Sequence, residues 1–251
     1  MKISIIGYGA MAKAILYGME NGKWEMENIE VVGRNIEKLK KIEKEFNIKT
    51  SFIDKYDITG KIVILAIKPY ALQEVSMRIK GEADILISIL AGKNLTKLKK
   101  YIKAKSYIRA MPNIAAKYQA STTAITGDEK AKEKAFEILS KIGDVFWVDN
   151  DDEIDMATAI IGSAPAFLAI IAEAISDGGV YIGLKRNVSE KLTRGLFKSF
   201  AAIKEDFPQI KNLVMSPRGT TAEGIKILEN GGLRGIIMKG IINTYEKSKK
   251  V

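Results

Sequence analysis

The 251-residue chain contains no cysteine and no histidine. Without cysteine there are no disulfide bonds, thiolate metal ligands or cysteine nucleophile. Without histidine the chain lacks the side chain that most often acts as general acid, general base or metal ligand. Any reaction catalysed by this chain must therefore proceed without these groups, and we expect no bound metal ion.

Long uncharged apolar runs are also missing. The most apolar stretch, residues 156–175, carries Glu173 and is interrupted by Gly162 and Pro165, so we expect no membrane-spanning helix. The N-terminal "MKISIIGYGAM" passes from a short apolar segment into a glycine turn without a cleavage-like site, which indicates a buried strand and not a signal peptide. We therefore predict a cytoplasmic protein with no membrane partner.

The formal net charge of +10 is compatible with a nucleic-acid surface or with a preference for small anionic ligands. The lysines, however, alternate with glutamates at helical spacing in "EKLKKIEKEF" and "DEKAKEKAFEIL". Such mixing is typical of solvated helix faces. We predict that the chain binds no nucleic acid.

Residues 1–150 alternate apolar β-rich segments with amphipathic helical ones, which predicts an α/β domain with a Rossmann-like, doubly wound parallel sheet. The expected strands are residues 2–7, 29–33, 61–67, 84–90, 106–111 and 144–148, and the expected helices are 10–20, 35–46, 70–79, 96–102 and 131–142. Residues 151–251 are expected to be all helical, with helices at 153–162, 165–183, 188–206, 221–231 and 233–250. Because several of these helices are apolar on most faces, we expect a subunit interface there.

The first expected strand leads into a glycine turn with the spacing of a dinucleotide-binding motif. Gly7, Gly9 and Ala12 fit G-x-G-x-x-[GA], in which glycines allow a tight turn and close approach of a pyrophosphate to the helix N-terminus. We predict that the turn, Gly7, Tyr8, Gly9, Ala10, Met11 and Ala12, binds the cofactor pyrophosphate. The alternative is a glycine turn used only for packing.

The end of the second expected strand distinguishes NADP from NAD. An acidic residue there would bind the ribose 2′-hydroxyl of NAD, but this chain has Arg34 and Asn35 in "VVGRN". A guanidinium matches a 2′-phosphate, whereas a carboxylate would repel it. We predict that NADPH is preferred and NADH is the second cofactor, with a surface cation as the alternative role of Arg34.

The stretch "SPRGTTAEG" at residues 216–224 lies between two expected helices but contains residues that helix interiors disfavour. A break at a helix start exposes backbone N–H groups suited to a carboxylate and adds threonine hydroxyls. The alternative is a simple N-cap made by Ser216 or Thr220.

Taken together with "AIKP" (66–69), "SILAG" (88–92), "RAMPN" (109–113), "GSAPAF" (162–167) and "DGG" (177–179), these motifs resemble those of the pyrroline-5-carboxylate reductase family over essentially the whole chain. The resemblance implies an NAD(P)H-dependent oxidoreductase that reduces 1-pyrroline-5-carboxylate to L-proline, the last step of proline biosynthesis. It also implies a Rossmann domain, residues 1–150, that binds NADP, and a helical substrate-binding and dimerisation domain, residues 151–251. The homodimers would assemble into a larger ring.

The resemblance also implies roles for individual residues. Ala66, Ile67, Lys68, Pro69, Ile89, Leu90, Ala91, Met111, Pro112 and Asn113 would complete the cofactor site. Ser216, Gly219, Thr220 and Thr221 would bind substrate, and Thr221 would be the catalytic residue whose hydroxyl meets the ring nitrogen.

Two positions depart from the family pattern: Arg218 and Ala164 stand where the family usually has glycine. We expect the backbone at Arg218 to need no positive φ, and its side chain either adds a cation beside the substrate or points to solvent. Ala164 indicates a slightly looser helix contact.

The chemistry suits a chain without histidine. Hydride addition to a protonated cyclic imine gives the amine directly, so the site must orient the substrate but needs no strong general acid. A His-dependent 2-hydroxyacid dehydrogenase is excluded, because the chain has no histidine. A 3-hydroxyacid dehydrogenase would need a lysine on the first helix of the second domain, but the sequence has no lysine between Asp149 and Gly183. An NADP-linked deazaflavin reductase and a non-catalytic dinucleotide sensor remain as alternatives.

Overall fold

The computed structural model describes residues 2–249 of the chain. It divides into two compact units: one runs up to Gly162 and resumes at Thr244, and the other is Ser163–Asn243. The chain leaves the last strand at Trp147 and enters the next helix at Asp151, which is where the sequence places the domain boundary. That boundary at residue 150 stays a prediction.

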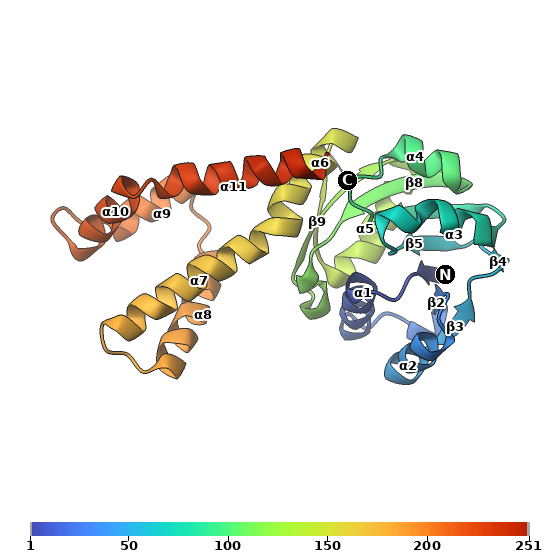
Figure 1. Cartoon of the computed structure of the whole chain (residues 1–251), viewed down its shortest axis with the longest axis horizontal. Helices are drawn as coiled ribbons and strands as arrows, with labels where there is room; N and C mark the ends of the chain where they lie inside the picture. Colours follow the sequence, from blue (N-terminus) through green and yellow to red (C-terminus); the bar gives the residue numbers. More distant parts are fainter. Residues whose placement is uncertain (1, 250–251) are drawn as a thin grey trace. The chain divides into compact units, whose positions relative to one another are not determined.

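The first unit is built on an eight-stranded sheet of order β10-β9-β8-β7-β5-β1-β2-β3 (Figure 1). Six neighbouring strands, β8 to β3 in this order, run parallel, and β9 pairs antiparallel with β8. Because the chain winds to one side of β1 and then returns to its other side at β5, the winding reverses between these two strands. The strands are β1 (Ile3–Ile6), β2 (Ile29–Gly33), β3 (Lys49–Phe52), β5 (Ile62–Leu65), β7 (Ala83–Ser88), β8 (Ala104–Met111), β9 (Ser121–Gly127) and β10 (Gly143–Trp147), with a small separate pair β4 (Tyr56–Asp57) and β6 (Ile79–Lys80).

Helices cover both faces of this sheet, because strand side chains alternate between two apolar clusters. Ile62 and Ile64 belong to one cluster, and Val63 and Leu65 to the other. The first cluster includes residues of α1 (Ala10–Asn21), α2 (Ile36–Phe46) and α5 (Lys132–Leu139); the second includes residues of α3 (Leu72–Arg78) and α4 (Leu95–Tyr101). The short helical turns are η1 (Met26–Asn28), η2 (Pro69–Ala71), η3 (Ile114–Tyr118), η4 (Glu129–Ala131) and η5 (Ser140–Ile142).

The six expected strands are all present, and the doubly wound order is confirmed. The sequence analysis missed β3 and β9 and the small pair. β3 reads "KTSF" and has no buried residue, and β9 reads "STTAITG", so neither shows the continuous apolar run by which the other strands were found. The reversed direction of β9 and β10 was also not predicted.

The helical half begins with α6 (Asp151–Thr158), which continues through a π-helical turn, η6 (Ala159–Ser163), into α7 (Ala164–Tyr181). It then forms α8 (Arg186–Ala202), α9 (Phe207–Val214), α10 (Thr220–Asn230) and α11 (Leu233–Ser248). α9 was not predicted; Asp206 caps it by accepting a hydrogen bond from the Gln209 N–H at 2.8 Å. The last residue of the expected helix 233–250 lies outside the described residues.

The second unit has no buried apolar side chain among its described residues. Its buried residues are Ser176, Ser189 and Thr193, and none of α9, α10 and α11 is buried at any position. Large apolar side chains are instead exposed, for example Ile170 by 65%. A helical unit with this surface needs a covering partner.

Gly179 explains part of the "DGG" motif. α7 and α8 pack closely there: a Cβ at Gly179 would lie 2.2 Å from the Ser189 Oγ atom. The Ser189 hydroxyl donates to the Ser176 carbonyl at 2.7 Å. A side chain at position 179 would therefore displace the Ser189 hydroxyl from this hydrogen bond.

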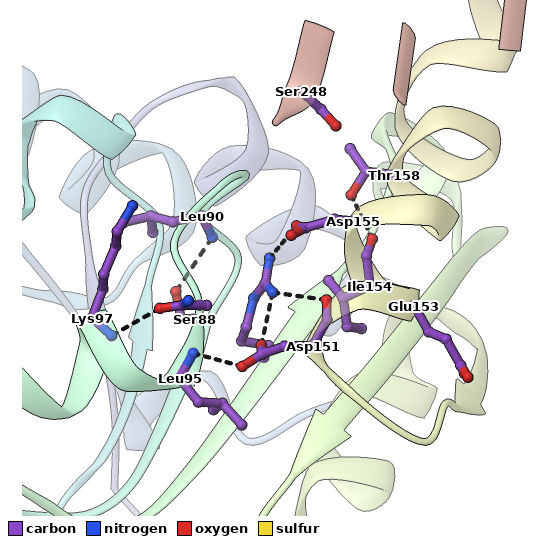
Figure 2. A network of polar contacts seen from close by, with 12 residues as sticks. Ser88, Leu90, Leu95, Lys97, Asp151, Glu153, Ile154, Asp155, Thr158 and Ser248 are labelled. Carbon is purple, nitrogen blue, oxygen red and sulfur yellow. Dashed lines mark hydrogen bonds and ion pairs between the residues drawn. The ribbon is translucent and has the colours of Figure 1, made fainter. Parts of the chain in front are cut away.

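A buried arginine ties α6 to the sheet of the first unit. Arg109 of β8 is 1% exposed and donates from Nη1 to Asp151 Oδ1 and from Nη2 to Asp155 Oδ1, both at 2.7 Å. Figure 2 shows Asp151 also accepting from the Leu95 N–H at 2.9 Å, at the start of α4. Loss of one partner from a buried ion pair leaves an uncompensated charge and costs about 3–5 kcal/mol. The "R" of "RAMPN" thus has a structural role.

A second polar network joins residues of β2, β3 and β4 with Lys61. The Glu30 carboxylate accepts hydrogen bonds from Ser51, at 2.5 Å, and from Tyr56, and Lys61 lies 3.3 Å away. Burial raises the pKa of Glu30, but the hydrogen bonds and the lysine outweigh it, so the net effect lowers that pKa. Glu30 is therefore ionised in the folded protein.

Candidate functional site

The glycine turn leaves β1 in a conformation that a side chain would obstruct. Gly7 has φ +118°, and a Cβ there would lie 2.3 Å from the Ala66 carbonyl oxygen on the neighbouring connection. Gly9 is the N-cap of α1 and places no side chain over the first backbone N–H groups of the helix. The turn follows β1, beside the point where the winding of the sheet reverses. This combination forms a cradle for a phosphate group.

A pocket of about 440 Å³ opens beside this turn, entirely within the first unit. It is lined by ten of the predicted cofactor residues: Gly7, Tyr8, Gly9, Ala10, Met11, Arg34, Ala66, Ile67, Lys68 and Ile89. Three separate segments of the sequence analysis, the glycine turn, "AIKP" and "SILAG", thus meet at one site.

Four other predicted cofactor residues lie outside the pocket lining and have structural roles. Ala12 is fully buried and packs α1 against the sheet, the packing role of the third position of the glycine motif. The Asn35 side chain caps α2 by accepting from the Lys38 N–H at 2.9 Å. Pro69 begins the turn η2, and Leu90 is 2% exposed within the apolar core.

The remaining predicted cofactor residues, Ala91, Met111, Pro112 and Asn113, also lie outside this pocket lining. Met111 is buried and packs with Ile154, and Ala91 contacts the same cluster. The Asn113 side chain accepts from the Ala115 N–H at 3.0 Å and so caps η3. A role of these four residues in cofactor binding stays a prediction.

The sequence analysis missed one whole wall of the pocket. Ala71, Glu74, Val75 and Arg78 line it from η2 and α3. Counted from Ala71, the other three lie three, four and seven residues further on, which is the spacing of a single helix face. The sequence thus shows that they share a face, but no known motif marks that face as part of a cofactor site. The other missed lining residues are Ile6, Val32, Gly33, Lys38, Ile53 and Tyr70.

Charged side chains gather at the Arg34 end of the pocket. Arg34 Nη1 donates to both oxygens of Glu74 at 3.0 and 3.1 Å, and Arg78 Nη2 lies 3.2 Å from Glu74 Oε1. Lys38 Nζ lies 5.7 Å from the centre of the Tyr8 ring. Hydrogen bonding to Glu74 raises the pKa of Arg34, which therefore stays cationic. The lining here has three cations and one carboxylate, and Asp54 pairs with Arg78 from outside the lining, so this end of the pocket keeps a net positive charge.

In the second unit, the stretch at 216–219 forms a β-turn in which the Ser216 carbonyl accepts from the Gly219 N–H at 3.0 Å. Arg218 has φ +62°, so the expectation that it needs no positive φ was wrong. Proline in the second position suits both type I and type II turns, and the positive φ of Arg218 in the third position is that of type II. The glycine usual in the family at this position suits that conformation without strain.

The helix α10 begins directly after this turn. Its N-cap is Gly219, with no side-chain hydrogen bond to the first turn, so the simple cap by Ser216 or Thr220 is not what the structure shows. A Cβ at Gly219 would lie 2.3 Å from Ser216 Oγ. Thr221 is half-buried, and within residues 2–249 no hydrogen bond engages its hydroxyl. The first backbone N–H groups of an 11-residue helix thus lie beside a free hydroxyl, an arrangement suited to an anionic ligand with a polar nitrogen.

Comparison with known proteins identifies the family. The model for pyrroline-5-carboxylate reductase dimerisation matches residues 151–251, and a model for coenzyme F420-dependent NADP oxidoreductases matches residues 2–92. The pyrroline-5-carboxylate reductase of Helicobacter pylori strain J99 is 35% identical over 255 residues, with 98% of each chain covered. The chain belongs to the pyrroline-5-carboxylate reductase family. It is thus an NAD(P)H-dependent oxidoreductase, as the sequence motifs predicted.

Solved reductases of this family confirm the fold. The Streptococcus pyogenes enzyme superimposes with a TM-score of 0.87 at 27% identity, covering 100% of this chain and 99% of that one. The Coxiella burnetii enzyme gives a TM-score of 0.86 at 27% identity, with 99% and 97% covered. A Rossmann-like domain followed by a helical dimerisation domain is therefore the architecture of this reductase.

The comparisons also separate the alternatives. The match at residues 2–92 alone fits an NADP-linked deazaflavin reductase, but the match at 151–251 and the full-length relatives favour the pyrroline-5-carboxylate reductase. The continuous helix Asp151–Tyr181 contains an 18-residue stretch with a mean hydropathy of 1.8, and it is long and apolar enough to cross a membrane by length and composition. Since it lies in the matched dimerisation segment, its exposed apolar surface is explained by a partner subunit.

Proposed function

We propose that this reductase uses NADPH in preference to NADH to convert 1-pyrroline-5-carboxylate into L-proline, the last step of proline biosynthesis. The observation that carries the proposal is the pocket of the first unit, where a phosphate cradle and Arg34 lie together and where Arg34 and Asn35, instead of an acidic residue, directly follow β2. A reductase of this family from Plasmodium falciparum is described with NADP bound, which supports the cofactor class.

The fit of the cofactor rests on residues of the pocket. The backbone of Gly7 to Met11 would hold the pyrophosphate at the start of α1, and Arg34 would bind the 2′-phosphate. Ala66 to Lys68 and Ile89 would line the nicotinamide half. The bound cofactor supplies a hydride to the substrate carbon.

The substrate would bind at the start of α10. The backbone N–H groups of Thr220 and Thr221 would contact its carboxylate together with the Ser216 hydroxyl, because the Gly219 N–H already closes the turn. The Thr221 oxygen would accept a hydrogen bond from the protonated ring nitrogen and so orient the C=N bond. The nitrogen keeps this proton when the carbon is reduced, so Thr221 positions the substrate without transferring a proton.

The exposed helices of the second unit support a homodimer, because a unit without buried apolar side chains needs a second copy to cover it. We further propose that the dimers assemble into a larger ring and that the enzyme is cytoplasmic. Size-exclusion chromatography with light scattering tests the assembly. A well-folded, fully active monomer at micromolar concentration would contradict it.

The activity is tested by following NADPH oxidation at 340 nm when 1-pyrroline-5-carboxylate is added to the purified enzyme. We expect turnover with this imine and none with 2-hydroxyacids, 3-hydroxyacids or an oxidised deazaflavin. Turnover of the deazaflavin without turnover of the imine would support the alternative function.

A further inference from the structure

The acidic residue that usually follows the second strand of NAD-binding enzymes is absent here, but another carboxylate occupies the same pocket. Glu74 comes from the first turn of α3, 40 residues after Arg34 in the sequence, and both of its oxygens accept hydrogen bonds from Arg34 Nη1. It is the one carboxylate among the described lining residues of this pocket. Nothing in the glycine motif requires an acid at that position.

Glu74 and a 2′-phosphate would need the same guanidinium. The Arg34 and Glu74 side chains are 57% and 38% exposed, and an ion pair this exposed is weak. A phosphate offers more negative charge and more acceptor oxygens than a carboxylate, so it can displace Glu74 from Arg34. The carboxylate then remains beside the phosphate as a like charge.

The neighbouring arginine lets this exchange occur without leaving Glu74 unpaired. Arg78 Nη2 already lies 3.2 Å from Glu74 Oε1, while Arg78 Nη1 contacts Asp54 Oδ1 at 2.9 Å. When a phosphate takes Arg34, Glu74 keeps its contact with Arg78. When the ribose carries only a hydroxyl, Glu74 stays paired with Arg34, and its carboxylate oxygens still have lone pairs that can accept a hydrogen bond from that hydroxyl, as the missing acid would have done.

We propose that Glu74 sets the balance between NADPH and NADH, by competing with the 2′-phosphate for Arg34 and by accepting the 2′-hydroxyl of NADH. This specificity role rests on the cofactor site proposed above. It gives the pocket a way to bind both cofactors, with NADPH favoured by the cations and NADH retained by the single carboxylate.

Two variants separate the two parts of the proposal. Glu74→Gln removes the charge but keeps an acceptor oxygen, whereas Glu74→Ala removes both. Glu137→Gln is the matched control, because Glu137 also forms a surface ion pair, with Lys134, but lies outside the pocket lining. The probes are adenosine 2′,5′-bisphosphate and 5′-AMP, titrated calorimetrically into the full-length enzyme, so that binding is read without turnover.

We expect both Glu74 variants to bind adenosine 2′,5′-bisphosphate about threefold to fivefold more tightly than the parent, the upper range for an exposed ion pair. Glu74→Gln should bind 5′-AMP like the parent, and Glu74→Ala should bind it about threefold to tenfold more weakly, because one hydrogen bond is lost. The KM for NADPH divided by the KM for NADH should therefore fall in both Glu74 variants. Glu137→Gln should match the parent with both probes.

Different failures have different meanings. If the parent prefers the bisphosphate but the Glu74 variants leave both affinities unchanged, the role of Glu74 is refuted and the cofactor site stands. If the parent binds the two probes equally or not at all, the 2′-phosphate site is refuted, and the role of Glu74 is refuted with it.

Discussion

Replacing Thr221 by valine tests the substrate site most directly. Thr221 is half-buried in the first turn of α10, and its hydroxyl has no hydrogen bond to lose within the described residues. Valine has nearly the same shape, so the folded protein should lose little stability. The loss falls on the bound substrate: a hydrogen bond to a charged group is worth about 1.5–3 kcal/mol, which corresponds to about a tenfold to hundredfold fall in kcat/KM.

The assay is steady-state NADPH oxidation with 1-pyrroline-5-carboxylate, combined with a fluorescence titration of NADPH. NADPH affinity should not change, because the cofactor pocket is built from the first unit and Thr221 belongs to the second. Thr221→Ser keeps the hydroxyl and should retain most of the activity. The reasoning is refuted if the valine variant is as active as the parent, or if its defect appears equally in NADPH binding.

Three further predictions concern other residues. Arg34→Asp should weaken NADPH binding by about tenfold or more and NADH binding much less, because an acid repels the 2′-phosphate; equal losses for both cofactors in a titration would remove Arg34 from the phosphate site. Arg218→Gly should raise the free energy of unfolding by about 1 kcal/mol in a denaturant titration by relieving the left-handed conformation, and no gain would show that the turn is unstrained. Because its folded-state pKa is lowered, Glu30 stabilises the protein above its ordinary pKa of about 4.3 and loses this effect as the pH falls through the lower folded value. The melting temperatures of Glu30→Gln and the parent should thus differ at pH 7 and converge below about pH 4, and a gap that persists in acid would contradict the pKa assignment.

The sequence predicted those parts of the fold and site that depend on local patterns. The turn at Gly7 and Gly9 was found because a positive φ and a close approach leave a direct mark on the sequence, and its two flanking elements were equally visible. The face of α3 that carries Glu74 and Arg78 was missed, because its place in the pocket depends on how the sheet winds and not on any local motif. Winding of this kind is set by contacts between distant segments.

Residues with two plausible roles were the hardest to assign. Asn35 suits both a phosphate contact and a helix cap, and the structure shows the cap. The side chain of Arg218 gave no sign of its backbone conformation, and the proline before it suits a type I turn as well as the type II turn that the structure shows. The residue type alone therefore did not show that Asn35 would cap a helix or that Arg218 would adopt a positive φ.

The absence of buried apolar side chains in the second unit has a consequence for how this enzyme folds. A single chain gains little hydrophobic free energy by arranging α7 to α11, because their apolar side chains stay in water until another subunit covers them. Folding of this half is therefore coupled to association, and the two processes form one equilibrium with a second-order concentration dependence. The thermal midpoint of the enzyme should rise with its concentration, and strong dilution should unfold the helical half while the sheet, with its own two apolar clusters, stays folded.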